Sequence, residues 1–495
     1  MKIEKQHKKY IQTAFAAMKS REDFLDLLNY VKPLIYGKES IPFKLQQLTY
    51  YINPWRSKNS YKEFQIKKKS GGTRTIYAPE NGLKAIQKTI ALILQCVFQP
   101  HEAAKGFVMG KSIVDNAKEH TDKNYVYNID LKDFFPSIDQ ARVWACLKLK
   151  PFNLIDVEDI KEFSYAKLET GIRKFTTEFD EQIFYKLEKG TLLIVNDKQG
   201  HYKKYEKRIT GLGADVFKDA AKYIATDANL KELTNLTVSR EKLANIIAAI
   251  CCAEMQVERK DNKGNWIKVQ KNVLPQGAPT SPVFSNIICQ RLDKRLTGVA
   301  KRFHLKYTRY ADDITFSSMH NVYQENGDFL KELNRIIKDQ GFEIKPSKTR
   351  LQKTGYRQEV TGLVVNDAVN VRKRYVKQIR MWIYYWEKYG YNKAESIFLR
   401  DYFIDKNQVK NTKPNFQNVL SGKLEYLKMV KGIENTTYLF LNKRFEKLIG
   451  FKNPLDTILT EWENNGIESA MEMFYAKNDS NQTKQETSSK PDFIV

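Results

Sequence analysis

Three aspartates stand at the ends of short apolar segments that have the composition of β-strands. Asp130 ends the segment YVYNID, and Asp312 and Asp313 form the acidic turn of KYTRYADDITFS. If these segments pair, three carboxylates converge, and they repel one another unless a cation lies between them. Two Mg²⁺ ions about 3.5 to 4 Å apart, held by hard oxygen ligands, support phosphoryl transfer to a hydroxyl. The spacing therefore predicts a two-metal site, although one Asp pair alone is more often a polar turn.

A β-hairpin with a cationic tip is expected upstream of the acidic segments. The stretch QIKKKSGGTRTIYAP has the pattern of a strand, a basic Gly-Gly turn and a second strand that Pro79 closes. A helix with Leu83, Ile86 and Ile90 on one face follows it. A solvated turn is the plain alternative for the basic tip.

Helical spacing marks both ends of the chain. Phe24, Leu27, Leu28 and Val31 predict a helix near the N-terminus. Two C-terminal stripes predict further helices: Ile379, Ile383 and Trp386, then Leu420, Leu424, Leu427 and Val430. Residues 371–450 carry 17 basic and 7 acidic side chains. This block is expected to clamp a duplex, and a plain helical bundle is the alternative.

A long stretch of chain separates the two acidic segments. Its pattern predicts two hairpins, which turn at Asn196 to Gly200 and at Asp261 to Asn265. A simple crossover needs far fewer residues, so residues 152–239 are interpreted as an inserted subdomain. The tail from Lys477 is rich in Ser, Thr and Gln and is expected to be disordered.

The charge balance favours a polyanionic partner. The chain has 495 residues, with 83 Lys and Arg against 58 Asp and Glu, and a formal net charge of +25. Surfaces that neutralise phosphates carry such a surplus, but on charge alone a merely basic protein is an equal alternative. Neither a membrane-spanning run nor a signal peptide is recognised, so a cytoplasmic location is expected. The five cysteines lack paired CxxC spacing and are expected to be reduced.

In order and spacing, five motifs resemble those of bacterial retron-type reverse transcriptases. They are NIDLKDFFPSI around Asp130, LPQGAPTSPVFSN from Leu274, YADD from Tyr310, GFEIKPSKT from Gly341 and VTGLVVN from Val360. Together they cover roughly Tyr61 to Gly450, and a match of this breadth is far more specific than any single motif. The resemblance implies an α+β, right-hand polymerase fold with fingers, palm and helical thumb, and with an insert in the palm and fingers region.

The resemblance also implies roles for individual residues. Asp130 and Asp312 would bind both metals, the Leu131 carbonyl would help hold the nucleotide-side ion, and Asp313 would support the ion at the primer end. The ions are expected to be Mg²⁺, with Mn²⁺ as a substitute. Arg74 and one lysine of the hairpin would neutralise the triphosphate, and which lysine leads is left open. The candidate lysines are Lys67, Lys68 and Lys69.

Three further residues would contact the nucleotide. Phe135 falls where reverse transcriptases have a bulky aromatic under the sugar, which predicts a preference for dNTPs; the alternative is an ordinary core Phe beside Phe134. In the LPQG loop, Gly277 permits close approach of the backbone to a nucleotide and Gln276 can hydrogen-bond to it.

The segment SIVDNAKEH contains the NAxxH pattern that is typical of retron-type enzymes. Asn116 and His120 lie four positions apart on one helical face, which suits contacts with RNA and equally suits a helix-capping network. With Lys348, they are the RNA-binding candidates. GKLEYLKMVKG, from Gly422, resembles the thumb of a wider set of defence-associated reverse transcriptases, so the subgroup is left open.

The domain boundaries are expected as follows: an N-terminal helical extension (1–60), fingers (61–128), the first part of the palm (129–151), the insert (152–239), the second part of the palm (240–370), the thumb (371–455) and a C-terminal helix and tail (456–495).

The function implied is RNA-directed DNA synthesis from a dedicated structured noncoding RNA, in antiphage defence. The expected partners are that RNA, an RNA/DNA duplex and dNTPs, with no membrane, and a homo-oligomer is left open. A group II intron-like maturase and a catalytically silent RNA-binding scaffold are the alternatives. An RNA-dependent RNA polymerase is disfavoured, because such enzymes typically carry GDD and a smaller or polar residue at the position of Phe135.

Overall fold

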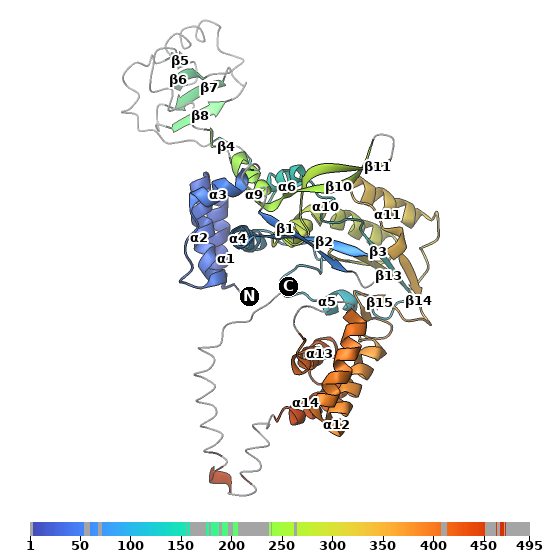
Figure 1. Cartoon of the computed structure of the whole chain (residues 1–495). Coiled ribbons are helices and arrows are strands. Elements are labelled where there is room, and N and C mark those ends of the chain that lie inside the picture. The colour runs from blue at the N-terminus through green and yellow to red at the C-terminus, as the bar shows by residue number, and fades with distance from the viewer. Residues whose placement is uncertain are drawn as a thin grey trace. The chain divides into compact units, whose positions relative to one another are not determined.

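The computed structural model forms two compact units, each made of segments that are distant in sequence (Figure 1). Unit 1 comprises Met1–Ile66, Gly72–Ser112 and Tyr127–Leu351, and unit 2 comprises Lys67–Gly71, Ile113–Val126 and Gln352–Val495. The structure describes residues 3–53, 60–67, 72–155, 240–261, 265–406 and 413–450, the backbone of short strands within 157–238, and a few positions within 462–471.

Four helices of unit 1 come from the first hundred residues. They are α1 (Lys5–Ala17), α2 (Arg21–Tyr36), α3 (Leu45–Ile52) and α4 (Asn81–Val97). At the start of α2, the Ser20 hydroxyl accepts a hydrogen bond from the Asp23 amide, and the Asp23 carboxylate accepts one from the Ser20 amide. The apolar stripes predicted for α2 and α4 are confirmed, since all of their named residues are buried.

A four-stranded sheet forms the centre of unit 1, and its strand order is β12-β13-β3-β14. The strands are β3 (Tyr125–Asp130), β12 (Lys306–Tyr310), β13 (Asp313–Ser318) and β14 (Arg350–Lys353). Helices α6 (Gln140–Leu147), α9 (Glu241–Cys251), α10 (Ser281–Arg302) and α11 (Asp328–Asp339) belong to the same unit. The Phe316 ring of β13 lies 5.1 Å from the Phe329 ring of α11, so this helix covers part of the sheet.

The hairpins predicted from the sequence are present. Strands β1 (Tyr61–Lys67) and β2 (Thr73–Pro79) pair in a two-stranded sheet, and β10 (Ala253–Lys260) pairs with β11 (Trp266–Val273) across the turn at Asp261 to Asn265. Within the expected insert, β5 (Phe175–Thr177), β6 (Asp180–Leu187), β7 (Thr191–Asn196) and β8 (His201–Tyr205) form an antiparallel sheet, and the short strands β4 (Val157–Glu158) and β9 (Thr237–Val238) pair with each other. Strands β7 and β8 pair antiparallel with Asn196 opposite His201, and the predicted turn between them lies outside the described residues.

Unit 2 is mainly helical. It contains α5 (Ile113–Lys118), the strand pair β15 (Glu359–Val360) and β16 (Leu363–Val364), α12 (Lys373–Lys406), α13 (Phe416–Lys431) and α14 (Thr436–Leu448). Gly390 interrupts α12, with φ 77° and ψ 172°. Asn415 and Asn435 cap α13 and α14 through their side chains. The two predicted C-terminal stripes are confirmed as part of one core, in which Trp386 is partly buried.

Residues 113–126 pack with the helical unit, although the sequence assigned them to the fingers. Val114, Ala117 and Val126 share a core with Val360 and Leu363. The other expected domain boundaries remain predictions. All five cysteines are free, and four of them are buried. None of the described helices combines the length and apolarity that crossing a bilayer requires. The expected disordered tail lies outside the described residues.

Candidate active site

Adjacent strands bring the three aspartates to the same end of the sheet in unit 1. Asp130 is the last residue of β3, and Asp312 and Asp313 lie at the turn between β12 and β13, the strand next to β3. The amide of Leu131 donates a hydrogen bond of 3.1 Å to the carbonyl of Asp312, which ties the two elements together. Asp130 is buried and Asp312 is half-buried. Asp313 is exposed as a whole residue, although protein atoms lie close enough to its carboxylate to desolvate it.

The tight turn at Ala311 depends on a close backbone approach. Ala311 has a positive φ of 57°, a conformation that L residues seldom adopt. A Cβ at Gly106 would lie 2.6 Å from the Ala311 nitrogen, so only glycine fits beside the turn. Sequence reasoning missed Gly106, because a lone glycine in a loop carries no signal of what approaches it.

Neighbouring carboxylates disfavour the ionisation of Asp312 and Asp313. Removal from solvent, with the charges of Asp312 and Asp130, raises the pKa of Asp313 from 3.8 to about 7. Removal from solvent and the charge of Asp130 also raise the pKa of Asp312. Lys348 opposes both shifts. The cluster therefore favours a bound cation, as such groups do when like charges are held together.

Lys348 supplies a positive charge at this cluster. It ends the short 3₁₀ helix Pro346–Lys348, and its Nζ lies 2.7 Å from Asp130 Oδ2. Burial lowers the pKa of Lys348, but the hydrogen bond and charge of Asp130 outweigh burial and raise it overall. The sequence made Lys348 an RNA-binding candidate; the structure instead puts its ammonium group at the candidate metal ligands.

The donor set fits Mg²⁺ in its chemistry, since it offers carboxylate oxygens on rigid backbone. The Leu131 carbonyl is a further candidate ligand. Its two neighbouring backbone hydrogen bonds run from Lys345 N to Asp130 O and from Lys132 N to Glu343 O, and the Leu131 carbonyl accepts neither of them. Among the described residues, no three His, Cys, Asp or Glu side chains already lie in a metal-binding arrangement. The Asp130 carboxylate faces Lys348 instead, so metal binding requires this ion pair to open.

The LPQG loop packs against the cationic hairpin. The amide of Tyr77 in β2 donates to the carbonyl of Gln276 over 2.8 Å. Gly277 has a φ of 129°, and a Cβ there would lie 2.6 Å from the Tyr77 carbonyl oxygen, so this position excludes a side chain. The exposed Arg74 of β2 is close enough to lower the pKa of Asp312, against the larger effects of burial and of Asp130, which raise it.

The structure describes one of the three candidate lysines of the hairpin. Lys67 is exposed at the end of β1 and is grouped with unit 2. Lys68 and Lys69 lie outside the described residues. Which lysine would meet a triphosphate therefore stays a prediction.

Phe135 is half-buried, whereas its neighbour Phe134 is a core residue at 4% exposure. The Phe135 ring lies 5.3 Å from the Phe134 ring and 6.2 Å from the Phe107 ring. Phe107 is 40% exposed and has a φ of 58°. Phe135 is thus supported from two sides and not enclosed, and sequence reasoning did not find its second support.

A buried ion pair anchors the turn that carries Asp312 and Asp313. Arg309 and Asp293 are both fully buried; Arg309 Nε donates to Asp293 Oδ1 at 2.8 Å, and Nη2 donates to Oδ2 at 2.7 Å. Nη2 also donates to Asn286 Oδ1 at 3.0 Å, and Nη1 donates to the Ala311 carbonyl at 3.1 Å. Asn286 Nδ2 in turn donates to the Gly106 carbonyl at 3.0 Å. The Arg309 guanidinium therefore connects α10 to the Ala311 turn, and Asn286 connects α10 to Gly106 beside that turn.

Asn116 and His120 are buried in unit 2, at 1% and 0% exposure. Asn116 Nδ2 lies 3.5 Å from Thr361 Oγ1, next to the glycine of the VTG motif. Side chains buried to this degree do not present polar atoms to RNA. The geometry therefore favours the internal network over the RNA contact that the sequence left equally open.

The chain matches known proteins over the region that contains this site. A family model described as reverse transcriptase (RNA-dependent DNA polymerase) matches residues 66–173 and 166–366. Retron Mx162 reverse transcriptase of Myxococcus xanthus is 30% identical over 338 residues, which are 66% of this chain and 52% of that protein. Retron Mx65 reverse transcriptase of the same species is 27% identical, over 66% of this chain and 55% of that protein. This chain therefore spans about half the length of these two relatives.

Retron Ec86 reverse transcriptase of Escherichia coli is 26% identical, over 66% of this chain and 69% of that protein. Among solved structures, apo telomerase from Candida Tropicalis aligns with a TM-score of 0.38 and 12% identity, over 85% of this chain and 63% of that chain.

The family model covers more than half of the chain and includes all three aspartates, Arg74, Phe135 and the LPQG loop. The α+β, right-hand polymerase fold expected from the motifs is confirmed by this match. The chain therefore belongs to the reverse transcriptase (RNA-dependent DNA polymerase) family, with the bacterial retron-type enzymes.

Proposed function

We propose that this chain is an RNA-directed DNA polymerase that makes cDNA by two-metal nucleotidyl transfer. The observation that carries the proposal is the convergence of Asp130, Asp312 and Asp313 at the same end of the sheet, with the pKa of Asp313 raised to about 7 by burial and by the other two carboxylates. Such a cluster is unfavourable without a cation and well suited to hold one.

Each group at the site has a part in this reaction. When bound, two Mg²⁺ ions would supply Lewis-acid activation of a 3′-hydroxyl and neutralise charge on the leaving pyrophosphate. Asp130 and Asp312 would hold both ions, with the Leu131 carbonyl on the nucleotide side and Asp313 on the primer side. Lys348, released from Asp130, and Arg74 would pair with phosphate oxygens of the dNTP. Gln276 would hydrogen-bond the nucleotide.

Primer extension tests this proposal directly. The purified chain with poly(rA), an oligo(dT) primer, dTTP and Mg²⁺ should extend the primer, and omission of the divalent ion should stop extension. A chain that binds the primer and template but adds no nucleotide would support the RNA-binding scaffold instead.

Replacing Phe135 with Ala should admit ribonucleotides, because the lost ring opens the volume that a ribose 2′-hydroxyl occupies. We expect the ratio of rNTP to dNTP incorporation to rise by about a hundredfold, since steric exclusion is worth a few kcal/mol. Single-nucleotide incorporation kinetics measure this ratio. Phe107→Ala is the matched control, because it removes a support of Phe135 and leaves the ring present. An unchanged ratio in the Phe135 variant would mean that the ring only packs.

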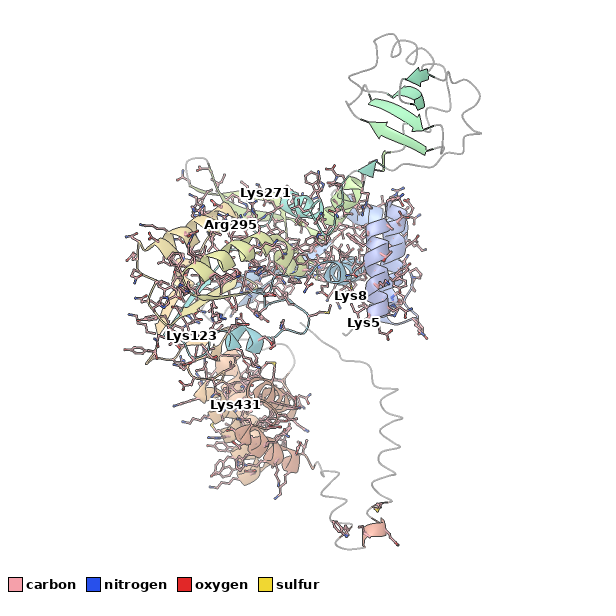
Figure 2. The ribbon with its side chains drawn as sticks, turned by 180° about the vertical axis from the view of Figure 1, so that it is seen from behind. Lys5, Lys8, Lys123, Lys271, Arg295 and Lys431 are labelled. Atoms are coloured by element: carbon pink, nitrogen blue, oxygen red, sulfur yellow. The ribbon has the colours of Figure 1, made fainter. Side chains whose placement is uncertain are left out.

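The template of this proposed polymerase is a dedicated structured noncoding RNA, and the resulting cDNA acts in antiphage defence. The curated relatives are named retron reverse transcriptases. Basic side chains occur on both units: Figure 2 labels Lys5 and Lys8 of α1, Lys271 of β11 and Lys431 at the end of α13. The chain has a net charge of +25, and Lys and Arg side chains neutralise nucleic-acid phosphates.

Purification from the native host at moderate salt should therefore yield one dominant RNA, encoded beside the gene. Its affinity should fall steeply with salt, with a log–log slope of several units, because several phosphates are neutralised. Deleting that locus should remove both the cDNA and phage resistance. Recovery of random cellular RNA, with a dispensable neighbouring locus, would contradict the dedicated template and leave a general template-copying enzyme.

A further inference from the structure

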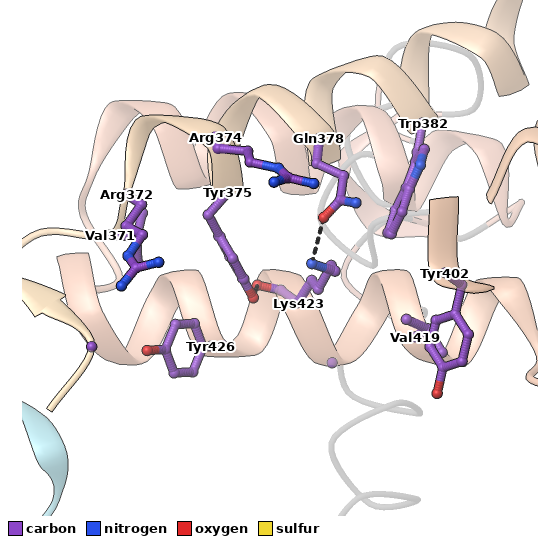
Figure 3. Close-up of a pocket in the computed structure, with 12 residues that line it drawn as sticks. Val371, Arg372, Arg374, Tyr375, Gln378, Trp382, Tyr402, Val419, Lys423 and Tyr426 are labelled. Atoms are coloured by element: carbon purple, nitrogen blue, oxygen red, sulfur yellow. Dashed lines mark hydrogen bonds between the residues drawn. The ribbon is translucent and has the colours of Figure 1, made fainter. Parts of the chain in front are cut away.

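Unit 2 contains a cavity of about 710 Å³ between α12 and α13. Its walls include Arg372, which precedes α12, Arg374 and Tyr375 in the first turn of α12, and Lys423 and Tyr426 on α13 (Figure 3). The volume lies within the range of roughly 300–1,000 Å³ that is typical of small-molecule sites. The cavity is made entirely by unit 2, and none of the candidate active-site residues lines it.

The walls of the cavity are cationic. Three of its lining residues are Arg or Lys, and none of the described lining residues is acidic. Arg372 pairs at 2.5 Å with Glu359, a buried carboxylate that Arg357 also contacts. Lys423 Nζ donates to Gln378 Oε1 at 2.9 Å, as the dashed line in Figure 3 marks. The α13 side of the cavity thus presents an ammonium group that a neutral amide holds in place.

Aromatic rings make up the remainder of the wall near this ammonium group. The Tyr375 and Tyr426 ring centroids lie 5.3 Å apart, and Lys423 Nζ lies 4.4 Å from the Tyr375 ring centroid. The Tyr375 hydroxyl donates to the Lys423 carbonyl at 3.0 Å, which fixes that ring. Rings next to Arg and Lys are the combination by which proteins hold an unpaired base and its phosphate.

Gly422 lies in the wall of the cavity. It lies in the interior of α13, where glycine is disfavoured relative to alanine, yet an added Cβ there would meet no atom within 4 Å. The backbone does not require glycine at this position, because its φ is that of an ordinary helix residue. There is therefore room for a larger side chain at this position in the wall of the cavity.

We propose that this cavity binds a nucleotide, with its phosphate at Arg374 and Lys423 and its base against Tyr375 and Tyr426. The nucleotide is either a free mononucleotide or an unpaired residue of a nucleic-acid strand, since the two share this chemistry. The proposal does not rest on polymerase activity, and binding alone tests it.

The test measures binding of AMP, adenosine and inorganic phosphate to the full chain in EDTA by calorimetry. AMP should bind at least about tenfold more tightly than adenosine or phosphate, because only AMP meets both walls. Gly422→Leu should weaken AMP by about tenfold or more by filling the space, whereas the matched Gly422→Ala should bind within about twofold of the wild type. Arg374→Gln should weaken AMP and leave adenosine unchanged. Glu254→Gln, an exposed acid on β10 in unit 1, should leave AMP affinity unchanged.

Three results would overturn the proposal: no AMP binding at millimolar concentration, unchanged AMP binding in both Gly422→Leu and Arg374→Gln, or phosphate binding as tight as AMP. A second arm distinguishes the sources. Ultraviolet crosslinking of single-stranded RNA that carries 4-thiouridine should label Tyr375 or Tyr426 if the site takes an RNA residue, and Gly422→Leu should abolish that label. AMP binding without such a crosslink would assign the site to a free nucleotide.

Discussion

Replacing Asp312 with Asn should lower the rate of DNA synthesis by about a thousandfold or more, because the candidate metal site loses a charged ligand next to the reacting atoms. Asp130→Asn should do the same. Single-turnover primer extension measures the loss, and filter binding of primer and template should stay near the wild-type value. Glu254→Gln, an exposed acid on β10, is the matched control and should keep full activity. Incorporation near the wild-type rate in Asp312→Asn would contradict the site assignment.

The aspartate cluster that should support DNA synthesis is also expected to lower the stability of the folded chain. The pKa of Asp313 is about 7 in the folded chain against an ordinary value of 3.8, so the folded state binds this proton more tightly than the unfolded state. Ionisation of Asp313 therefore lowers the free energy of unfolding progressively from about pH 4 to about pH 7, and the full loss persists above pH 7. In EDTA, Asp313→Asn should melt at a higher temperature than the wild type, by more at about pH 8 than at about pH 5. Mg²⁺ should then raise the melting temperature of the wild type more than that of the variant.

Replacing Arg309 with Met should reduce the free energy of unfolding by about 3–5 kcal/mol, because it leaves the buried Asp293 carboxylate without its cation. It should also reduce DNA synthesis, because the Ala311 carbonyl loses the donor that anchors the turn with Asp312 and Asp313. Denaturant titration measures the first effect, and single-turnover extension at a temperature where the variant is folded measures the second.

The double variant Arg309→Met with Asp293→Leu separates these two effects. Replacing both charges with apolar groups should restore much of the stability, since no buried charge is left unpaired. Synthesis should remain impaired, because the turn still lacks its anchor. Full activity in the double variant would show that the ion pair serves the fold and does not position the aspartates.

Local patterns in the sequence were sufficient for several elements. The stripe Phe24, Leu27, Leu28 and Val31 lies on the buried face of α2, because a helix repeats about every 3.6 residues and only such spacing makes one apolar face. The hairpin at Asp261 could be predicted equally well, because two segments with strand composition flank a polar segment. The assignment of residues 113–126 to the fingers followed their place in the sequence; their packing with residues after 352 depends on contacts between distant segments, which no local pattern encodes.

By itself the sequence determined the family, the five motifs and the three aspartates, because residue types in a fixed order identify a chemistry without coordinates. Only the tertiary structure decided what surrounds them. In the folded chain Lys348 forms an ion pair with Asp130, and Asn116 and His120 are buried. Gly106 lies in close backbone contact with Ala311. The cavity beside Gly422 likewise exists only in three dimensions. The physical reason is common to all of these: burial, charge pairing and close backbone approach are set by distances between residues far apart in the chain, and a linear sequence contains the residues but not those distances.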